Sequence, residues 1–171
     1  QSVLILNAED SVETQLLAKI RQLGGDLSRI FALDVSTGKS MSSIKIGSTD
    51  MADIIRHLKP ALCILDPLQA FLSADVNMAA RNAMRNYLEP LHELGMETGC
   101  TFLIVCHSNK RKGASGRDRL ADSADLWDMA RAIVMAGYTG ENDTRYLSHE
   151  KAAMQGRWRP FCLRLRMVCL S

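Results

Sequence analysis

The 171-residue sequence has little excess charge and no paired-cysteine motif, and these absences exclude several classes of protein. Lys and Arg number 21 against 19 Asp and Glu, a formal net charge of +2, so only a local basic patch could bind nucleic acid. The five cysteines form no Cys-x-x-Cys pair, which disfavours a disulfide framework or a zinc ribbon. No apolar run approaches the roughly 20 residues that span a bilayer, and no signal-peptide pattern opens the chain. We therefore expect a cytoplasmic protein with no membrane partner.

The composition is that of a globular protein, 47% hydrophobic and 23% charged. Domains of roughly 100–200 residues are common, so we predict a single domain over residues 1–171. The sequence begins at Gln1 rather than Met, directly before an apolar run. We therefore also expect that a segment upstream of Gln1 is missing.

Short apolar runs alternate with helical patterns along the chain. Four runs are too short for helices and are apolar without alternation, which is typical of strands buried on both faces of a parallel sheet. They are Val3–Leu6, Ala61–Leu65, Phe102–Cys106 and Ile133–Ala136, with Ile30–Leu33 as a fifth, weaker candidate. This order predicts an α/β fold with a largely parallel sheet flanked by helices.

Apolar residues at spacings of three and four predict two helices. The first begins at Asp10, which has the capping-box spacing to Glu13, and ends at Gly24-Gly25. Its apolar residues are Val12, Leu16, Ile20 and Leu23. The second helix is predicted from Ala79 to Glu97, and residues 36–50, rich in Ser, Thr and Gly, are predicted to form a loop.

The pattern changes beyond Ala136. Residues 138–143 (YTGEND) predict a turn between two strands, and Phe161–Val168 alternates apolar and polar residues as a half-exposed strand does. The C-terminal third is therefore predicted to be an antiparallel extension of the parallel core.

Polar residues follow three of the apolar runs, and ligands of open α/β sheets bind beyond the carboxyl ends of the strands. Asp66 directly follows the second run, where a carboxylate can hold a nucleotide-bound Mg²⁺, and a turn-forming aspartate is the alternative. Glu9 can activate an attacking water, or it can complement the dipole of the following helix. His107 can sense a phosphate, or it can be a histidine bonded locally.

A basic cluster follows His107 and contains glycines but no aromatic residue. Its cations are Lys110, Arg111, Lys112, Arg117 and Arg119. Such a segment can follow a phosphate backbone, and a solvated loop is the alternative. Two other motifs fail. Gly38-Lys39-Ser40 is not a P-loop, because Leu33 stands where that loop needs glycine. Cys106 and His107 are not expected to form a catalytic dyad, because adjacent residues on a strand point to opposite faces.

Five stretches, in order, resemble the RecA-like ATPases of the RepA type, which are hexameric replicative helicases of plasmids with related phage and mobile-element ATPases. The stretches are VLILNAEDSVETQLLAKIRQLGGDLSRI, LCILDPLQAFLSADVNM, TFLIVCHSNK, GRDRLADSADLWDMARAIVMAG and RYLSHEK, from about Val3 to about Lys151. The resemblance implies a three-layer RecA-like fold, ATP and Mg²⁺ as cofactors, single-stranded DNA as partner and a homo-oligomeric ring, a hexamer.

The resemblance also implies roles for individual residues. Glu9 matches the catalytic glutamate that activates water and helps to bind the nucleotide, and Asp66 matches the Walker B aspartate that holds Mg²⁺. His107 matches the residue that links the γ-phosphate to the DNA-binding loop, which corresponds to residues 110–119.

Two basic residues near the other end, Arg131 and Lys151, are similar to those that reach the phosphate of the neighbouring subunit. A cation supplied in trans would make hydrolysis depend on assembly.

The sequence departs from this family in having no glycine-rich phosphate loop before Val3. We expect the first strand, the P-loop and its helix to be missing, which would leave part of the sheet uncovered and the chain a poor ATP binder with little turnover. The chain is expected to be a fragment of a DNA helicase or DNA-stimulated ATPase involved in replication. The alternative is a non-catalytic remnant of the same fold that binds DNA or a partner protein.

Overall fold

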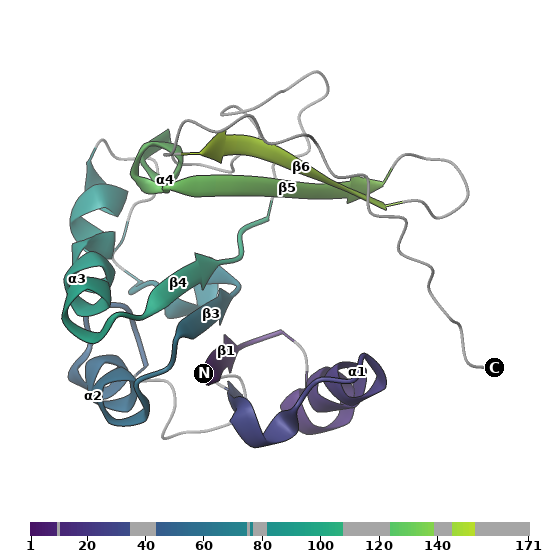
Figure 1. The fold of residues 1–171 in the computed structure, drawn as a ribbon. Coiled ribbons are helices and arrows are strands. Elements are labelled where there is room, and N and C mark those ends of the chain that lie inside the picture. The colour runs from purple at the N-terminus through teal and green to yellow at the C-terminus, as the bar shows by residue number, and fades with distance from the viewer. Residues whose placement is uncertain are drawn as a thin grey trace.

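The computed structural model describes residues 1–9, 11–34, 44–74, 76, 82–107, 124–138 and 145–152. Its central feature is a four-stranded sheet in the order β2-β1-β3-β4, in which all neighbouring strands are parallel (Figure 1). The strands are β1 (Val3–Asn7), β2 (Ile30–Asp34), β3 (Leu62–Asp66) and β4 (Thr101–Ile104). Four of the five predicted strands therefore form the predicted parallel sheet.

Helices lie on both sides of this sheet, which gives the predicted three-layer α/β arrangement of the RecA-like type (Figure 1). The longer helices α2 (Thr49–Leu58) and α3 (Ala83–Thr98) lie on one side, and α1 (Leu17–Gln22) lies on the other. Short helical turns connect these elements: η1 (Val12–Leu16), η2 (Leu27–Arg29) and η3 (Leu68–Phe71).

The main core lies between the sheet and the helices α2 and α3. On the sheet it contains Leu4, Leu6, Cys63 and Leu65, and on the helices Met51, Ile55, Met84, Leu88, Leu91 and Leu94. The helical members recur at spacings of three and four, so each helix presents one apolar stripe to the sheet. The second helix, predicted from Ala79 to Glu97, is confirmed over the described residues, where it begins at Ala83.

The prediction that these strands are buried on both faces is wrong for β3 and β4. Burial alternates along β3, and Leu103 on β4 is 49% exposed. A continuous run of apolar residues shows that the side chains on both faces of a strand could be buried. It does not show whether other parts of the chain cover both faces.

The first helix differs from its prediction at its beginning and in one residue of its predicted apolar face. Its N-cap is Ser11, whose hydroxyl accepts a hydrogen bond from the Thr14 amide at 3.4 Å, and Asp10 lies outside the described residues. Because Ser and Asp are equally good N-caps, the sequence pattern could not separate two adjacent candidates. The chain leaves the helix before Gly24, as predicted, but Leu23 is 87% exposed and belongs to no apolar face.

A second sheet consists of the antiparallel strands β5 (Ala132–Tyr138) and β6 (Arg145–Ala152), preceded by α4 (Ala124–Met129) (Figure 1). The predicted antiparallel extension is thereby confirmed. The placement of Ile133–Ala136 in the parallel sheet is wrong, because in the described residues β5 pairs with β6. A six-residue connection, 139–144, can join antiparallel neighbours, whereas a parallel pair needs a longer crossover. The predicted strand Phe161–Val168 lies outside the described residues.

Candidate functional site

The carboxyl ends of β1, β3 and β4 meet at one edge of the parallel sheet. The Ala8 amide donates to the Asp66 carbonyl at 2.9 Å, and the Val105 amide donates to the Leu65 carbonyl at 2.9 Å. These bonds continue the strand pairing past the last residue of β1 and of β4. They bring the segments that carry Glu9, Asp66 and His107 side by side.

Glu9 and His107 contact each other at this edge. Nε2 of His107 lies 2.9 Å from Oε1 of Glu9, although the two residues are 98 positions apart in the sequence. Both side chains are more than half exposed, so the contact stabilises the fold little. Its importance is positional, because it places a carboxylate and an imidazole together where ligands bind in sheets of this type.

Asp66 ends β3, the strand that lies between the strands delivering Glu9 and His107. In the pairing register Asp66 is opposite Asn7, and its side chain is half-buried. Carboxylate oxygens at such an edge suit Mg²⁺, which is commonly bound by one or two carboxylates together with substrate phosphates. Among the described residues, no group of three or more His, Cys, Asp or Glu side chains is arranged to hold a metal ion.

Asn7 is a residue of this edge that the sequence patterns did not indicate. Its side chain is buried, and its Oδ1 accepts a hydrogen bond from the Glu9 amide at 3.3 Å. A buried asparagine at a strand end is the available signal, but burial cannot be seen in a sequence without the fold.

The neighbouring Cys106 is not an activated nucleophile. Burial raises the pKa of its thiol to about 11, so the thiol stays protonated at neutral pH. This agrees with the prediction that Cys106 and His107 do not form a catalytic dyad.

The two basic residues expected to act in trans lie on the hairpin side of the molecule. Lys151 is on β6, and its Nζ donates to the carbonyls of Trp127 at 2.7 Å and Asp128 at 3.0 Å, near the end of α4. Arg131 is exposed and lies between α4 and β5. Their action on a neighbouring subunit stays a prediction.

The predicted DNA-binding residues lie outside the described part of the chain. They are Lys110, Arg111, Lys112, Arg117 and Arg119. His107 is the last described residue before them.

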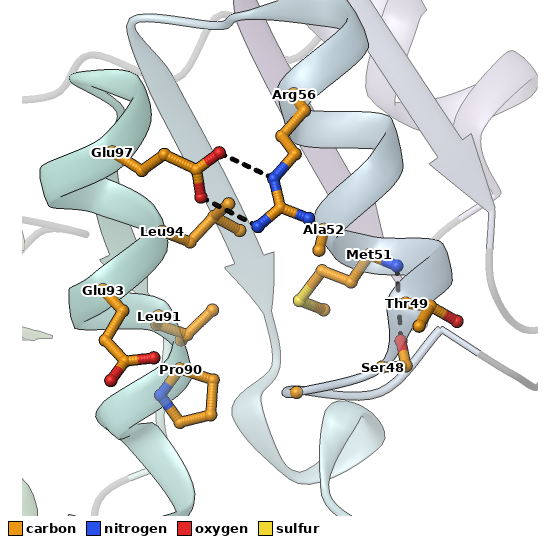
Figure 2. A pocket seen from close by; sticks show the side chains of 11 residues that line it. Ser48, Thr49, Met51, Ala52, Arg56, Pro90, Leu91, Glu93, Leu94 and Glu97 are labelled. Atoms are coloured by element: carbon orange, nitrogen blue, oxygen red, sulfur yellow. Dashed lines mark hydrogen bonds and ion pairs between the residues drawn. The ribbon is translucent and has the colours of Figure 1, made fainter.

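A cavity of about 290 Å³ lies elsewhere, between α2 and α3 (Figure 2). Its apolar wall includes Met51 and Leu94, and the guanidinium of Arg56 binds both carboxylate oxygens of Glu97 at 2.8 Å. None of the predicted site residues lines it. We therefore place the candidate functional site at the sheet edge and not in this cavity.

A parallel sheet flanked by helices on both sides is consistent with an α/β fold of the RecA-like type. Residues 1–113 match the model of a family described as "AAA domain", about two thirds of the 171 residues. The chain belongs to this family, whose members generally bind nucleotide with Mg²⁺, and an ATPase-related function follows. A search of curated proteins found no match. No helix in the described ranges is long and apolar enough to cross a membrane.

Proposed function

We propose that this chain is the core of a DNA-stimulated, helicase-type ATPase of a plasmid, phage or mobile-element replication protein. The observation that carries the proposal is the 2.9 Å contact between Glu9 and His107 beside the strand end that bears Asp66. It joins a residue suited to activating water with a residue that lies three positions before the basic segment 110–119.

Each residue of the edge has a separate task in this proposal. Mg²⁺ bound with ATP would supply charge compensation on the phosphates, and Asp66 would hold it. Glu9 orients a water and accepts its proton, since a carboxylate at a water-accessible edge is a suitable general base. His107 moves with Glu9 because the two side chains are bonded, so binding at 110–119 changes the position of the base.

The chain has carboxylates suited to holding Mg²⁺ and to activating water, but it has no loop suited to binding the phosphates of ATP. A P-loop requires the pattern GxxxxGK[ST], which does not occur in the 171 residues. The chain alone is therefore proposed to bind ATP weakly and to turn it over hardly at all. In a ring, most simply a hexamer, Arg131 or Lys151 would supply positive charge to the site of the neighbouring subunit.

The first test measures Mg²⁺-dependent ATP binding and hydrolysis, on this chain and on a version joined to any in-frame P-loop segment encoded upstream. We expect turnover from the joined version only, and Glu9→Gln should lower kcat by about 100-fold or more, because a positioned general base contributes about that much. Glu13→Gln is the matched control, since Glu13 is an exposed carboxylate in the first turn of the next helix. Equal kcat values for the two variants would exclude Glu9 as the base.

A non-catalytic module is the second candidate, since the five cations between residues 110 and 119 could bind a polyanion without nucleotide turnover. Such a module would keep the fold and the basic segment and would bind single-stranded DNA or a partner ring. It is the better interpretation if neither version binds ATP while the chain still binds single-stranded DNA.

A further inference from the structure

Asn7 is the one polar residue, among those that the structure describes, whose side chain is as buried as the apolar core. It is 3% exposed and ends β1. Burying an amide is unfavourable unless the amide is hydrogen-bonded. An apolar residue would be the simpler choice for packing, so the amide at this position calls for a specific partner.

One partner of Asn7 is the main chain of Glu9. Oδ1 of Asn7 accepts the Glu9 amide at 3.3 Å, and the intervening Ala8 amide donates to the Asp66 carbonyl at 2.9 Å. Two successive amides are thus fixed directly after β1. The turn that they define carries the Glu9 carboxylate to within 2.9 Å of His107.

The strand register adds a second reason for an amide at this position. Asn7 is opposite Asp66, so the two side chains project from the same face of neighbouring strands, which are about 4.8 Å apart. A carboxylate at position 7 would add a third negative charge beside Asp66 and Glu9. A leucine would add no charge, but it could not accept the Glu9 amide.

We propose that Asn7 is a positioning residue for Glu9: its buried amide fixes the turn after β1 and so sets the place of the Glu9 carboxylate against His107. The catalytic consequence rests on the proposed function, but the structural role does not. In a version of the chain that hydrolyses ATP, Asn7→Leu is expected to lower kcat by about 100-fold with an unchanged KM for ATP, because a small displacement of a reacting group has an effect of that size.

The test measures nuclear Overhauser effects between the His107 ring protons and the Glu9 side chain in the isotope-labelled chain. Asn7→Leu and Asn7→Ala should lose this signal while the amide spectrum of the sheet is retained. Ile5→Val is the matched control, because Ile5 is buried on the same face of β1 and its truncation loosens the strand without touching the Glu9 turn.

Wild-type signal in both Asn7→Leu and Asn7→Ala would overturn the assignment, and so would loss of the signal in Ile5→Val. If neither Asn7 variant folds, Asn7 serves the fold itself and the assignment is withdrawn. The ATPase proposal fails separately: absence of Mg²⁺-dependent turnover in the version joined to a P-loop segment would reject it, whereas the Overhauser signal would still decide the role of Asn7.

Discussion

Cys106 and His107 are neighbours in the sequence but differ in their surroundings. The Cys106 thiol is largely enclosed, whereas the His107 side chain is 63% exposed and reaches Glu9. Both residues lie beyond the end of β4, and adjacent residues of reactive type need not cooperate when one is enclosed and the other is exposed.

Slow alkylation of Cys106 is the prediction that follows. Burial raises its pKa from 9.0 to about 11, which lowers the thiolate fraction at neutral pH by about 100-fold. We expect iodoacetamide to label Cys106 at least about 100-fold more slowly in the native chain than in the same chain unfolded in urea, as measured by mass spectrometry of the peptides. Cys63, whose pKa burial raises to about 12, is the internal reference and should react no faster. Rapid labelling of native Cys106 would reopen the dyad interpretation.

The candidate site was largely predictable at the residue scale, and the reason is geometric. Parallel strands place their carboxyl ends at one edge, so residues that follow them, such as Glu9 and His107, must come close if the strands are neighbours. Asn7 could not be found this way. Its role depends on burial and on a hydrogen bond to a residue two positions away, neither of which leaves a pattern in the sequence.

At the scale of elements, helices α2 and α3 are joined by apolar packing and by one exposed ion pair. The bidentate hydrogen bonds from Arg56 lower the pKa of Glu97, and those to Glu97 raise the pKa of Arg56 (Figure 2). Because the pKa of Glu97 is lower in the folded chain than in the unfolded chain, the unfolded chain takes up the proton first. The stabilisation is therefore complete above the ordinary value of 4.5 and is lost as the pH falls through the lowered pKa.

Glu97→Gln should therefore reduce the loss of thermal stability on going from pH 6 to pH 3. The measurement is the melting midpoint across this range by circular dichroism. Glu93→Gln is the matched control, because Glu93 lies one turn earlier on α3 and forms no ion pair with another described residue. The effect should be small, since both partners are half exposed. Identical pH profiles for the two variants would show that the ion pair does not contribute.

Helix α3 was predictable from the sequence because the spacing of its apolar residues matches the face that it buries. The place of a strand in a sheet was less predictable, because it depends on which other strand pairs with it. Ile133–Ala136 is apolar enough for a central strand, but the short connection to β6 makes it half of a hairpin in which Val134 is 57% exposed. The same hairpin brings Gly137 against the ring of Tyr146, where an added Cβ would lie 2.6 Å from the phenol. Such cross-strand contacts depend on the register, which is set only after the turn has formed.

At the scale of the whole molecule, the nearly balanced net charge makes the basic segment decisive for any DNA binding. With a formal charge of +2, the chain has no general attraction for a polyanion, and five cations are concentrated between residues 110 and 119. Since His107 precedes this segment and contacts Glu9, DNA binding and the candidate catalytic edge are expected to be coupled.

Replacing Arg117 and Arg119 with Ala should therefore weaken binding of single-stranded DNA and flatten its salt dependence. Each phosphate contact to a single strand contributes about 0.7 to the slope of log K against log salt, so the loss of two contacts should lower the slope by about 1.4. The measurement is fluorescence anisotropy of a labelled oligonucleotide between low and moderate salt. Arg21→Ala with Arg85→Ala is the matched control, because it removes the same charge from exposed positions on α1 and α3. If both double variants change the slope equally, the binding is diffuse and the segment 110–119 is a solvated loop; if only the first does, this segment is the DNA contact.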